Sequence, residues 1–276
     1  MTMITALSDL RLAFIGGGVM GTAIATGLLK QGMVEPNQIV VAEPMVTRRD
    51  AVAAQLGVVT TGDNAEAVSG ADVVLFAVKP QVLGTVLAGL RGLVPPGTLV
   101  LSIVAGATIA TYREALGVPC IVRVMPNTPA QVGQGATVWT ATPEVTEAQR
   151  AEARAILGAL GLEVYVDNER YLDAATALSG SGPAYVFLFI EALTDVGVEM
   201  GFTRDVAYKL ALQTVKGSAI YAEQSGLHPA ILRNQVTSPG GTTAAALAEF
   251  ERGAFRSVVA SAVRAAERRS QELGAK

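Results

Sequence analysis

The sequence predicts an α/β protein: a doubly wound, mostly parallel sheet followed by an all-helical region. Short β-branched runs alternate with amphipathic stretches as far as Val166, which is typical of a parallel sheet with helices on both faces. After Asp167 no strand pattern recurs. Half of the 276 residues are apolar and 16% are charged, so the chain has material for a large core and does not have the composition of a disordered protein.

In the first region, each expected strand is a short apolar run bounded by turn residues. The expected strands are Arg11–Ile15, Ile39–Ala42, Val73–Ala77, Leu99–Ile103, Ile121–Val124, Ala136–Thr140 and Glu163–Val166. The expected helices between them span residues 19–31, 46–56, 80–91, 108–116 and 146–160. The close succession of strands near residues 121–140 indicates that the sheet is extended at one edge.

The second region is divided by glycine, proline and serine breaks. Its expected helices span residues 168–178, 183–200, 203–225, 228–236, 242–252 and 254–273. Residues 184–193 are apolar nearly all round, so we expect this helix to be buried on every side. About a hundred residues of helix rarely enclose such a segment alone, so a partner subunit is expected to help bury it. We place the domain boundary between residues 1–167 and 168–276.

Composition excludes several classes of partner. The net charge is −3, which gives no hint of a basic face for a nucleic acid. One cysteine and one histidine build neither a disulfide nor a His/Cys zinc site, so we expect no metal and a cytoplasmic protein. The uncharged runs 12–29 and 92–112 contain Gly or Pro interruptions, and we interpret both as buried parts of a soluble domain rather than as membrane spans.

A glycine-rich turn follows the first expected strand. Residues 16–21, Gly-Gly-Gly-Val-Met-Gly, fit the pattern G-x-G-x-x-G in its required strand-to-helix context. Gly16 permits the tight turn, Gly18 lets a pyrophosphate approach the backbone, and Gly21 lets the helix lie close to the strand. The N–H groups at the start of the helix then hold the phosphate. We favour a dinucleotide site, and hence a Rossmann-type domain, over an ordinary glycine-rich turn.

Residues near the second and third strands bear on the cofactor. Glu43 ends the second strand, where an acid would bond the ribose hydroxyls and favour NAD. Arg48 and Arg49 follow on the next helix; they either meet a 2′-phosphate or form a solvated helix face. The sequence therefore leaves NADH and NADPH both open. Lys79, after the strand 73–77, is either a catalytic acid or base or, as we favour, a solvated loop residue.

The helical region carries one candidate anion site. Residues 238–243, Ser-Pro-Gly-Gly-Thr-Thr, precede a helix; they suit a carboxylate, and an ordinary N-cap by Ser238 or Thr242 is the alternative. The break at residues 179–183 indicates either close helix packing or a substrate wall. We expect His228 to have a capping or surface role. Arg123, inside an apolar strand, is expected to pair with a buried acid or an interface group.

These motifs, in this order, resemble the pyrroline-5-carboxylate reductase family over nearly the whole chain. The most specific stretch is Gln235–Leu247, and Ala177–Tyr185, Val78–Gln81 and Arg123–Pro129 add to it. The resemblance implies a Rossmann domain followed by an all-α dimerisation domain. It also implies reduction of the C=N bond of 1-pyrroline-5-carboxylate to L-proline by NADPH or NADH, the last step of proline biosynthesis, in homodimers or rings of dimers.

The resemblance also implies roles for individual residues. The cofactor would be held by Gly16, Gly18, Val19, Met20, Gly21, Asn64, Ala77, Val78, Lys79, Pro80, Ile103, Val104 and Ala105. Glu43 is added to these from its position at the end of the second strand. The substrate would be held by Glu169, Ser238, Gly240, Gly241, Thr242 and Thr243, with the Thr243 hydroxyl as the catalytic group near the ring nitrogen. Two residues depart from the family: relatives often have a small hydroxyl residue in place of Glu43, and some have Asn in place of Gln235.

Three other functions are compatible with this architecture. A β-hydroxyacid dehydrogenase would need a helix-borne lysine, and Lys209 and Lys216 lie in no matching motif. A general imine reductase would share both domains. A non-catalytic NAD(P)-binding protein would not need the intact loop 238–243, whose presence therefore argues against it.

Overall fold

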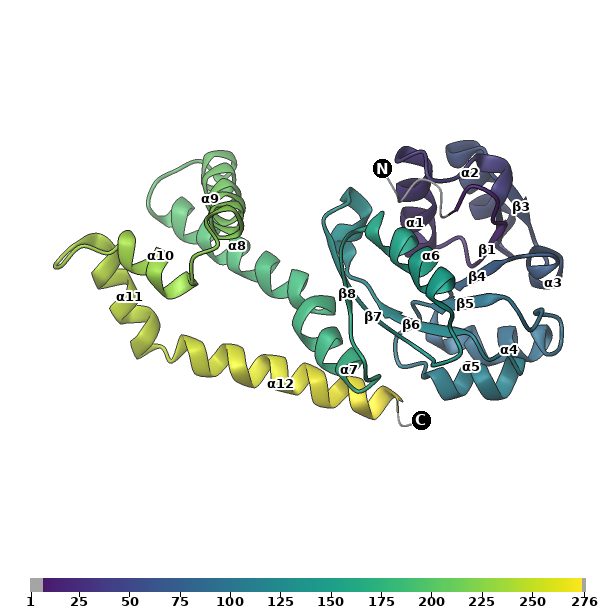
Figure 1. The fold of residues 1–276 in the computed structure, drawn as a ribbon. Helices are drawn as coiled ribbons and strands as arrows, with labels where there is room; N and C mark the ends of the chain where they lie inside the picture. Colours follow the sequence, from purple (N-terminus) through teal and green to yellow (C-terminus); the bar gives the residue numbers. More distant parts are fainter. Residues whose placement is uncertain (1–6, 275–276) are drawn as a thin grey trace. The chain divides into compact units, whose positions relative to one another are not determined.

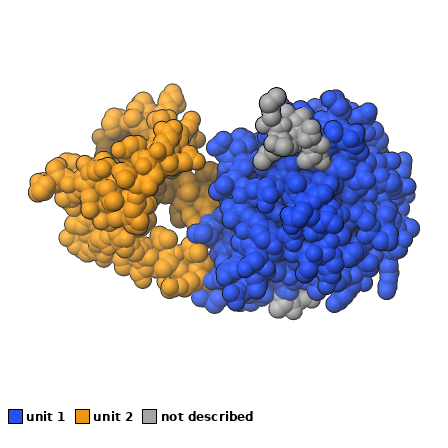
Figure 2. All heavy atoms as spheres, in the orientation of Figure 1, with its two compact units in different colours: residues 1–181, 266–276 blue, residues 182–265 orange. Residues whose placement is uncertain are grey.

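The structure is a computed structural model that describes residues 7–274. It separates into two compact units: the chain up to Ser181 together with the segment from Ala266 onward, and Gly182–Ala265 (Figure 2). The last strand ends at Tyr165, and the division by compactness comes later, at Ser181. The predicted domain boundary after residue 167 stays a prediction.

The first unit is built on one eight-stranded sheet with the order β3-β2-β1-β4-β5-β6-β7-β8. The strands are β1 Leu12–Ile15, β2 Ile39–Ala42, β3 Val59–Thr61, β4 Val73–Phe76, β5 Leu99–Ser102, β6 Ile121–Met125, β7 Gly135–Ala141 and β8 Gly161–Tyr165. Neighbouring strands are parallel except for β6 and β7, which are antiparallel. The doubly wound sheet and its extension at one edge are confirmed. The strand β3 was not predicted; of its three residues Val59 is exposed, Thr60 is half-buried and only Thr61 is buried.

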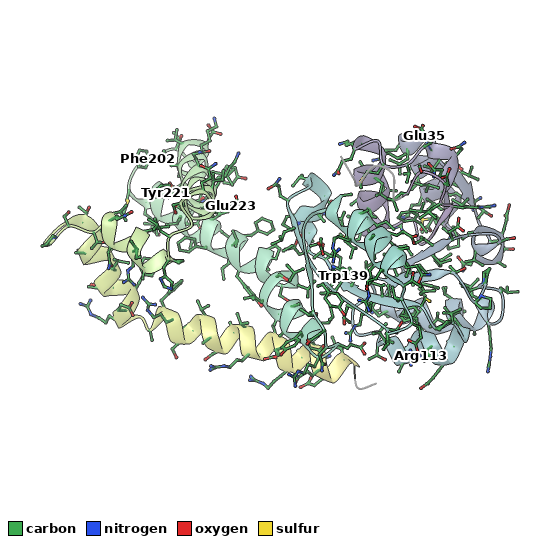
Figure 3. The ribbon with its side chains drawn as sticks, in the orientation of Figure 1. Glu35, Arg113, Trp139, Phe202, Tyr221 and Glu223 are labelled. Atoms are coloured by element: carbon green, nitrogen blue, oxygen red, sulfur yellow. The ribbon has the colours of Figure 1, made fainter. Side chains whose placement is uncertain are left out.

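Helices cover both faces of this sheet (Figure 1). Buried residues of α1, α2 and α6 share one core, with Trp139 of β7 among its members, and those of α3, α4 and α5 share the other. Figure 3 shows Trp139 in the sheet region of this unit. The elements are α1 Val19–Lys30, α2 Val46–Leu56, α3 Asn64–Val68, α4 Pro80–Leu90, α5 Ile109–Leu116, α6 Glu147–Gly158 and α7 Tyr171–Ala175, with 3₁₀ turns at Pro36–Gln38 and Thr128–Val132 and a π-helical turn at Thr176–Gly180.

The two faces explain the strand sequences. β1, β2 and β4 are buried at every position, as expected of central parallel strands, which read as continuous apolar runs. The uncharged run 12–29 forms β1 and most of α1. The sequence pattern and the sheet therefore agree where the strands are buried on both faces.

The second unit is entirely helical. Its helices are α8 Gly182–Glu199, α9 Arg204–Ser225, α10 Pro229–Gln235 and α11 Thr242–Arg252, followed by α12, Phe255–Gly274, whose last residues belong to the first unit. α8 and α9 pack closely at Gly197, where a Cβ would come within 2.8 Å of the Ala207 Cβ. Phe202, Tyr221 and Glu223 are labelled in this part of Figure 3.

In the single chain α8 is not buried on every side, as expected if a partner subunit is needed to cover it. Phe187 is 62% exposed and Leu188 66% exposed, because the helices of one chain cover only part of this apolar helix. One helical run of the described chain, Tyr171–Glu199, also has the length and hydropathy of a membrane-crossing helix. A large exposed apolar face of this kind marks an interaction surface.

Thr137 of β7 offers a test of the core. Its hydroxyl is fully buried and has no hydrogen-bond partner among the described residues. Because an unpaired buried hydroxyl is costly, we expect Thr137→Val to raise the free energy of unfolding by about 1 kcal/mol. Urea denaturation of the purified protein measures this change.

The matched control is Thr98→Val. Thr98 is equally inaccessible, but its hydroxyl donates a hydrogen bond to the Ala71 carbonyl at 3.0 Å. The same substitution should therefore lower the free energy of unfolding there by about 1 kcal/mol. Equal destabilisation at both positions would contradict the assignment of an unpaired hydroxyl at Thr137.

Candidate functional site

The carboxyl ends of β1, β2, β4 and β5 meet at one edge of the sheet and carry most of the predicted cofactor residues. The Gly16 N–H donates to the Ala42 carbonyl at 2.9 Å, and the Ala77 N–H donates to the Ile15 carbonyl at 2.9 Å. The Ile103 N–H donates to the Phe76 carbonyl at 3.1 Å. These bonds bring the glycine turn, Glu43, the 77–80 stretch and the 103–105 stretch to the edge where open α/β sheets bind ligands.

The three motif glycines differ in what surrounds them. Gly16 has a φ of +110°, and a Cβ there would lie 2.8 Å from the Ala77 carbonyl oxygen. A Cβ on Gly21 would lie 2.5 Å from the Gly16 carbonyl oxygen. A Cβ on Gly18 would meet only one described atom within 4 Å, at 3.9 Å. The fold itself requires Gly16 and Gly21, whereas Gly18 keeps open a space that suits a pyrophosphate.

The start of α1 is suited to an anion. Gly18 is the N-cap, and no side chain caps it. Val19, the first helical residue, is 65% exposed, and the first turn of α1 holds no acidic residue. The N–H groups of the first turn, on Val19, Met20 and Gly21, therefore present the positive end of the helix dipole at the sheet edge. These residues fit the diphosphate of a dinucleotide.

Two other predicted positions lie at helix starts of the same unit. Asn64 is the first residue of α3, directly after the capping residue Asp63. Lys79 is the N-cap of α4, its side chain is exposed, and Pro80 is the first residue of that helix. An exposed lysine at a helix start agrees with the solvated position that we favoured from the sequence.

A buried hydrogen-bond network supports the stretch 103–105. The Ser102 hydroxyl donates to the Tyr112 hydroxyl at 2.5 Å and accepts from the Val104 N–H at 3.2 Å. Burial raises the pKa of Tyr112 above its ordinary value, an effect that the bond to Ser102 and the nearby charge of Arg123 only partly offset. Tyr112 therefore stays neutral and positions this stretch. Sequence analysis missed this network, because Tyr112 lies on a helix with no recognisable motif.

Arg123 has a specific partner in the structure. Its Nη1 lies 2.9 Å from Glu169 Oε1, and the same oxygen accepts a hydrogen bond from the Ile109 N–H at 2.8 Å. The Arg123 side chain is 9% exposed and that of Glu169 31% exposed. The prediction that Arg123 pairs with an acid is confirmed. Glu169, expected near the substrate, thus ties β6 to the start of α5 through one oxygen.

Hydrogen bonds of Asn127 join two of the sequence motifs, Arg123–Pro129 and Ala177–Tyr185. Asn127 donates through Nδ2 to the Ser179 carbonyl at 3.0 Å and accepts through Oδ1 from the Ala136 N–H at 2.9 Å. Ser179 lies in the π-helical turn, which passes so close to β6 that a Cβ on Gly180 would lie 2.8 Å from the Met125 Cε. Close packing is therefore confirmed for this break, and the π-turn itself had no signal in the sequence.

The end of α12 also lies against this edge of the first unit. The Ser270 hydroxyl donates to the Asp173 carboxylate at 2.6 Å, and Ser270 is buried. Gly106 has a φ of +77°, and a Cβ there would lie 3.5 Å from the Leu273 carbonyl oxygen. The loop after β5 is therefore fixed at both ends, by the hydrogen bonds that join Ser102 to Tyr112 and Val104 and by the bond from the Ile109 N–H to Glu169. The last turn of α12 contacts it at Gly106.

The candidate anion site of the second unit is the turn before α11. The N-cap is Gly241, which no side chain caps, so the alternative in which Ser238 or Thr242 caps the helix is wrong. The Gly241 N–H donates to the Ser238 carbonyl at 3.0 Å, and Gly240 has a φ of +70°. A Cβ on Gly241 would lie 2.8 Å from the Ser238 Oγ. The glycines therefore bring the Ser238 hydroxyl to an uncapped helix start that carries Thr242 and Thr243.

His228 has the capping role that the sequence indicates. Its Nδ1 accepts a hydrogen bond from the Ala230 N–H at 3.2 Å at the start of α10. The predicted site residues include no histidine, and the role of His228 is to cap α10.

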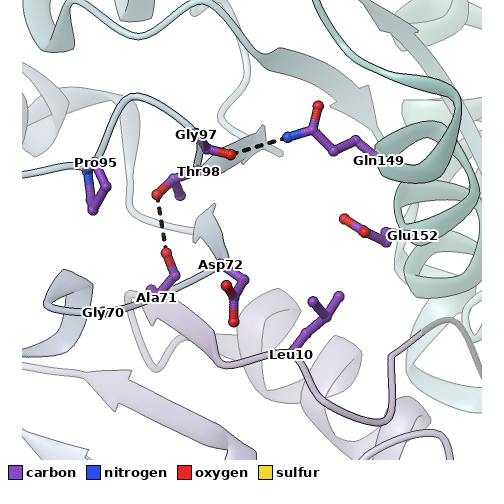
Figure 4. A pocket seen from close by; sticks show the side chains of 9 residues that line it. All are labelled: Leu10, Gly70, Ala71, Asp72, Pro95, Gly97, Thr98, Gln149 and Glu152. Carbon is purple, nitrogen blue, oxygen red and sulfur yellow. Dashed lines mark hydrogen bonds between the residues drawn. The ribbon is translucent and has the colours of Figure 1, made fainter.

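A pocket at the opposite, amino ends of the strands is distinct from the predicted site (Figure 4). Asp72 and Thr98 line it just before β4 and β5, and Gln149 and Glu152 line it from α6. Burial, together with the charge of Asp72, raises the pKa of Glu152. The Asp72 carboxylate accepts from the Arg11 N–H at 2.8 Å, and Gln149 donates to the Gly97 carbonyl at 3.1 Å. These bonds connect loops of the fold.

A doubly wound sheet with a glycine turn and an open helix start at its carboxyl edge is typical of a dinucleotide-binding enzyme. Residues 11–106 match the family model for NADP oxidoreductase, coenzyme F420-dependent. Residues 169–273 match the family model for pyrroline-5-carboxylate reductase dimerisation. The chain is 48% identical to the pyrroline-5-carboxylate reductase of Synechocystis sp. over 97% of its length and 100% of that protein. It therefore belongs to the pyrroline-5-carboxylate reductase family.

Further relatives agree with this assignment. The enzyme of Pseudomonas aeruginosa is 43% identical over 97% of this chain and 98% of that protein. The solved structure of the Coxiella burnetii enzyme has a TM-score of 0.90 and 39% identity, covering 96% of this chain and 98% of that one. A Plasmodium falciparum pyrroline carboxylate reductase solved with NADP bound has a TM-score of 0.86 and 33% identity, covering 96% and 98%. The predicted family, fold class, enzyme class and NAD(P)H dependence are confirmed.

The Arg123–Glu169 ion pair generates a prediction. Arg123→Met leaves the half-buried Glu169 carboxylate with only the Ile109 N–H. Breaking a fully buried pair costs about 3–5 kcal/mol. Because the Glu169 side chain is 31% exposed, we expect a loss of about 1–3 kcal/mol in the free energy of unfolding. Denaturant titration measures this loss.

Arg113→Met is the matched control. The Arg113–Glu144 pair has the same 2.9 Å separation, but its side chains are 48% and 46% exposed; Figure 3 labels Arg113. Its removal should cost less than about 1 kcal/mol. If both variants lose the same free energy of unfolding, the Arg123–Glu169 pair stabilises the fold no more than an exposed ion pair does.

Proposed function

We propose that this chain reduces the C=N bond of 1-pyrroline-5-carboxylate to L-proline, with hydride from NADH or NADPH, as the last step of proline biosynthesis. The observation that carries the proposal is its 48% identity to a pyrroline-5-carboxylate reductase over 97% of the chain. The open space at Gly18 and the uncapped start of α11 support it, because the reaction needs sites for a diphosphate and for a carboxylate.

The turn at residues 238–243 is proposed to bind the substrate carboxylate. The backbone N–H groups of Gly240 and Thr242, with the hydroxyls of Ser238 and Thr242, would receive it at the positive end of α11. The Gly241 N–H donates to the Ser238 carbonyl, so Gly241 would contribute by holding the turn in shape beside the carboxylate. Glu169 is proposed as a further substrate neighbour; its Oε2 is not used in the bonds to Arg123 and Ile109.

The dinucleotide is proposed to lie along the carboxyl edge of the sheet. Gly16, Gly18, Val19, Met20 and Gly21 would hold the diphosphate. Further contacts are proposed for Glu43, Asn64, Ala77, Val78, Lys79, Pro80, Ile103, Val104 and Ala105. A reduced nicotinamide, when bound, supplies the hydride for the reaction.

The reaction requires little general acid–base catalysis from the protein. The substrate nitrogen takes a proton from solvent, and the resulting iminium carbon accepts the hydride as the C=N π bond opens onto nitrogen. The protein must chiefly hold the two reactants in the correct orientation, which can supply several kcal/mol. The Thr243 hydroxyl, in the first turn of α11, is proposed to hydrogen-bond the developing amine nitrogen. No essential histidine or cysteine is needed.

We propose that a second copy covers the exposed face of α8. The helical run Tyr171–Glu199 lies inside the segment 169–273 that matches the dimerisation model, which favours a protein partner over a lipid bilayer. A homodimer, or a ring of dimers, in the cytoplasm is the proposed assembly. A net charge of −3 gives no support to a nucleic acid partner.

The direct test is oxidation of NADH and NADPH, side by side, with 1-pyrroline-5-carboxylate, with 3-hydroxy acids and with unrelated cyclic imines. We expect turnover with 1-pyrroline-5-carboxylate at a kcat/KM at least about a hundredfold above the other substrates. Preference for 3-hydroxy acids would indicate a β-hydroxyacid dehydrogenase, and equal use of many imines a general imine reductase. Cofactor binding without any turnover would indicate a non-catalytic NAD(P)-binding protein.

Thr243 is the position at which the proposal is most specific. Thr243→Ala removes the hydroxyl but leaves the helix start, so we expect kcat to fall by about ten- to a hundredfold while the Kd for the cofactor changes by less than about twofold. Thr243→Ser keeps the hydroxyl and should retain most activity. Steady-state kinetics and calorimetry measure the two quantities, and wild-type turnover in Thr243→Ala would remove Thr243 from the mechanism.

A further inference from the structure

Among the described residues, Glu43 is the buried carboxylate near the glycine turn. It follows β2 directly, its residue surface is 5% exposed, and its own N–H donates to the Thr61 carbonyl at 2.9 Å. An acid at the end of the second strand of a Rossmann-type sheet lies where the adenosine ribose of a dinucleotide binds. The Glu43 carboxylate is therefore expected to affect whether a 2′-hydroxyl or a 2′-phosphate can be bound on that ribose.

Two backbone N–H groups fix this carboxylate. Oε2 accepts from the Gly17 N–H at 3.1 Å, and Oε1 accepts from the Met45 N–H at 3.1 Å. Each carboxylate oxygen has two lone pairs, so each retains one for a further donor. Ribose hydroxyls are such donors, whereas a 2′-phosphate presents only acceptors and about two negative charges near neutral pH.

The glycine turn and Glu43 are matched in shape. A Cβ on Gly17 would lie 3.2 Å from the Glu43 Cβ and 3.4 Å from Oε2. The carboxylate therefore rests on the backbone of the turn whose next residue, Gly18, is proposed to face the diphosphate. For Glu43 to move away from a 2′-phosphate, it would have to give up both backbone hydrogen bonds.

The nearby arginines do not cancel this effect. Arg48 Nη1 lies 3.8 Å from Glu43 Oε2, beyond hydrogen-bond distance, and its side chain is 47% exposed. Arg49 donates through Nη1 to the Glu43 backbone carbonyl at 3.1 Å, a bond that does not use the carboxylate oxygens. Among the described residues neither guanidinium hydrogen-bonds the Glu43 carboxylate, so the carboxylate keeps its acceptors for the ribose hydroxyls. In a variant without Glu43, the half-exposed Arg48 is a cation that can pair with a 2′-phosphate.

We propose that Glu43 makes this enzyme select NADH over NADPH. The proposal rests on the proposed function, and it differs from what the Plasmodium falciparum relative, solved with NADP bound, would suggest. Selectivity arises here from a preformed acceptor: the Gly17 and Met45 N–H groups hold the carboxylate toward the ribose hydroxyls, and the same charge repels a phosphate.

The test compares calorimetric Kd values for NADH and NADPH, without substrate, in the full-length protein. We expect the wild-type protein to bind NADH at least about tenfold more tightly than NADPH, the ratio given by one hydrogen bond to a charged group. Glu43→Ser should shift the ratio of the two Kd values by at least about tenfold toward NADPH. Glu43→Gln keeps the shape and one acceptor but removes the charge, so its ratio should lie between the two.

Two further variants locate the effect. Glu114→Gln removes the same charge from an exposed position on α5 and should leave the ratio within about twofold of wild type. Adding Arg48→Ala to Glu43→Ser should remove at least about threefold of the gained NADPH affinity. Circular dichroism and the thermal midpoint establish that each variant is folded, and Glu43→Gln gives an answer even if Glu43→Ser is unstable.

Three binding results would overturn the proposed selectivity for NADH. Wild-type Kd values within twofold of each other, tighter NADPH binding, or a ratio unchanged in both Glu43 variants overturns the proposal. The ratio of kcat/KM values with 1-pyrroline-5-carboxylate separates it from the proposed function. Turnover that favours NADPH refutes only the selectivity, whereas NADH-selective binding without turnover on this substrate refutes only the reaction.

Discussion

The candidate cofactor edge depends on one backbone contact, the close approach of the glycine turn to the end of β4. Gly16 turns with a φ that other residues rarely adopt, and no Cβ fits between it and the Ala77 carbonyl. This contact lets β1 and β4 lie side by side as central strands while the chain leaves β1 for α1. The carboxyl ends of β2 and β5 then fall at the same edge. A side chain at Gly16 would separate the strands that bring the predicted residues together.

How far the sequence predicts this structure depends on the range of the interactions. Strands buried on both faces, such as β1 and β4, were recognisable because burial alone dictates their composition. β3 was not, because it is only three residues long and only its last residue is buried. The π-turn at Thr176–Gly180 was also unpredicted, because it depends on the fit of Gly180 against Met125, fifty-odd residues earlier in the chain. The apolar pattern of α8 predicted a helix that needs more cover than one chain provides, and the structure of one chain leaves its Phe187 and Leu188 exposed.

The candidate site shows the same limit. The glycine turn and the turn before α11 are local motifs, and their geometry follows from a few consecutive residues. The ion pair that fixes Glu169 joins residues that are 46 positions apart, and the Asn127 bond to Ser179 spans 52. A sequence can reveal that Arg123 is anomalous in an apolar strand, but only the fold determines which acid it meets. The supporting network of the site is therefore the part that required a structure.

The two candidate anion sites both lie at helix starts that no side chain caps. Side chains cap α3, α5, α6, α9 and α10 through Asp63, Thr108, Thr146, Thr203 and His228. No side chain caps α1, α2, α4, α7 or α11. Of these, α1, α2 and α4 follow the ends of β1, β2 and β4, and α11 carries Thr242 and Thr243. Since an unsatisfied helix start must find an acceptor elsewhere, open starts at these positions are what a protein that binds two anions through its backbone requires. In such a design few charged side chains are needed, and the single buried carboxylate among these starts, Glu43, has a large influence on which dinucleotide fits.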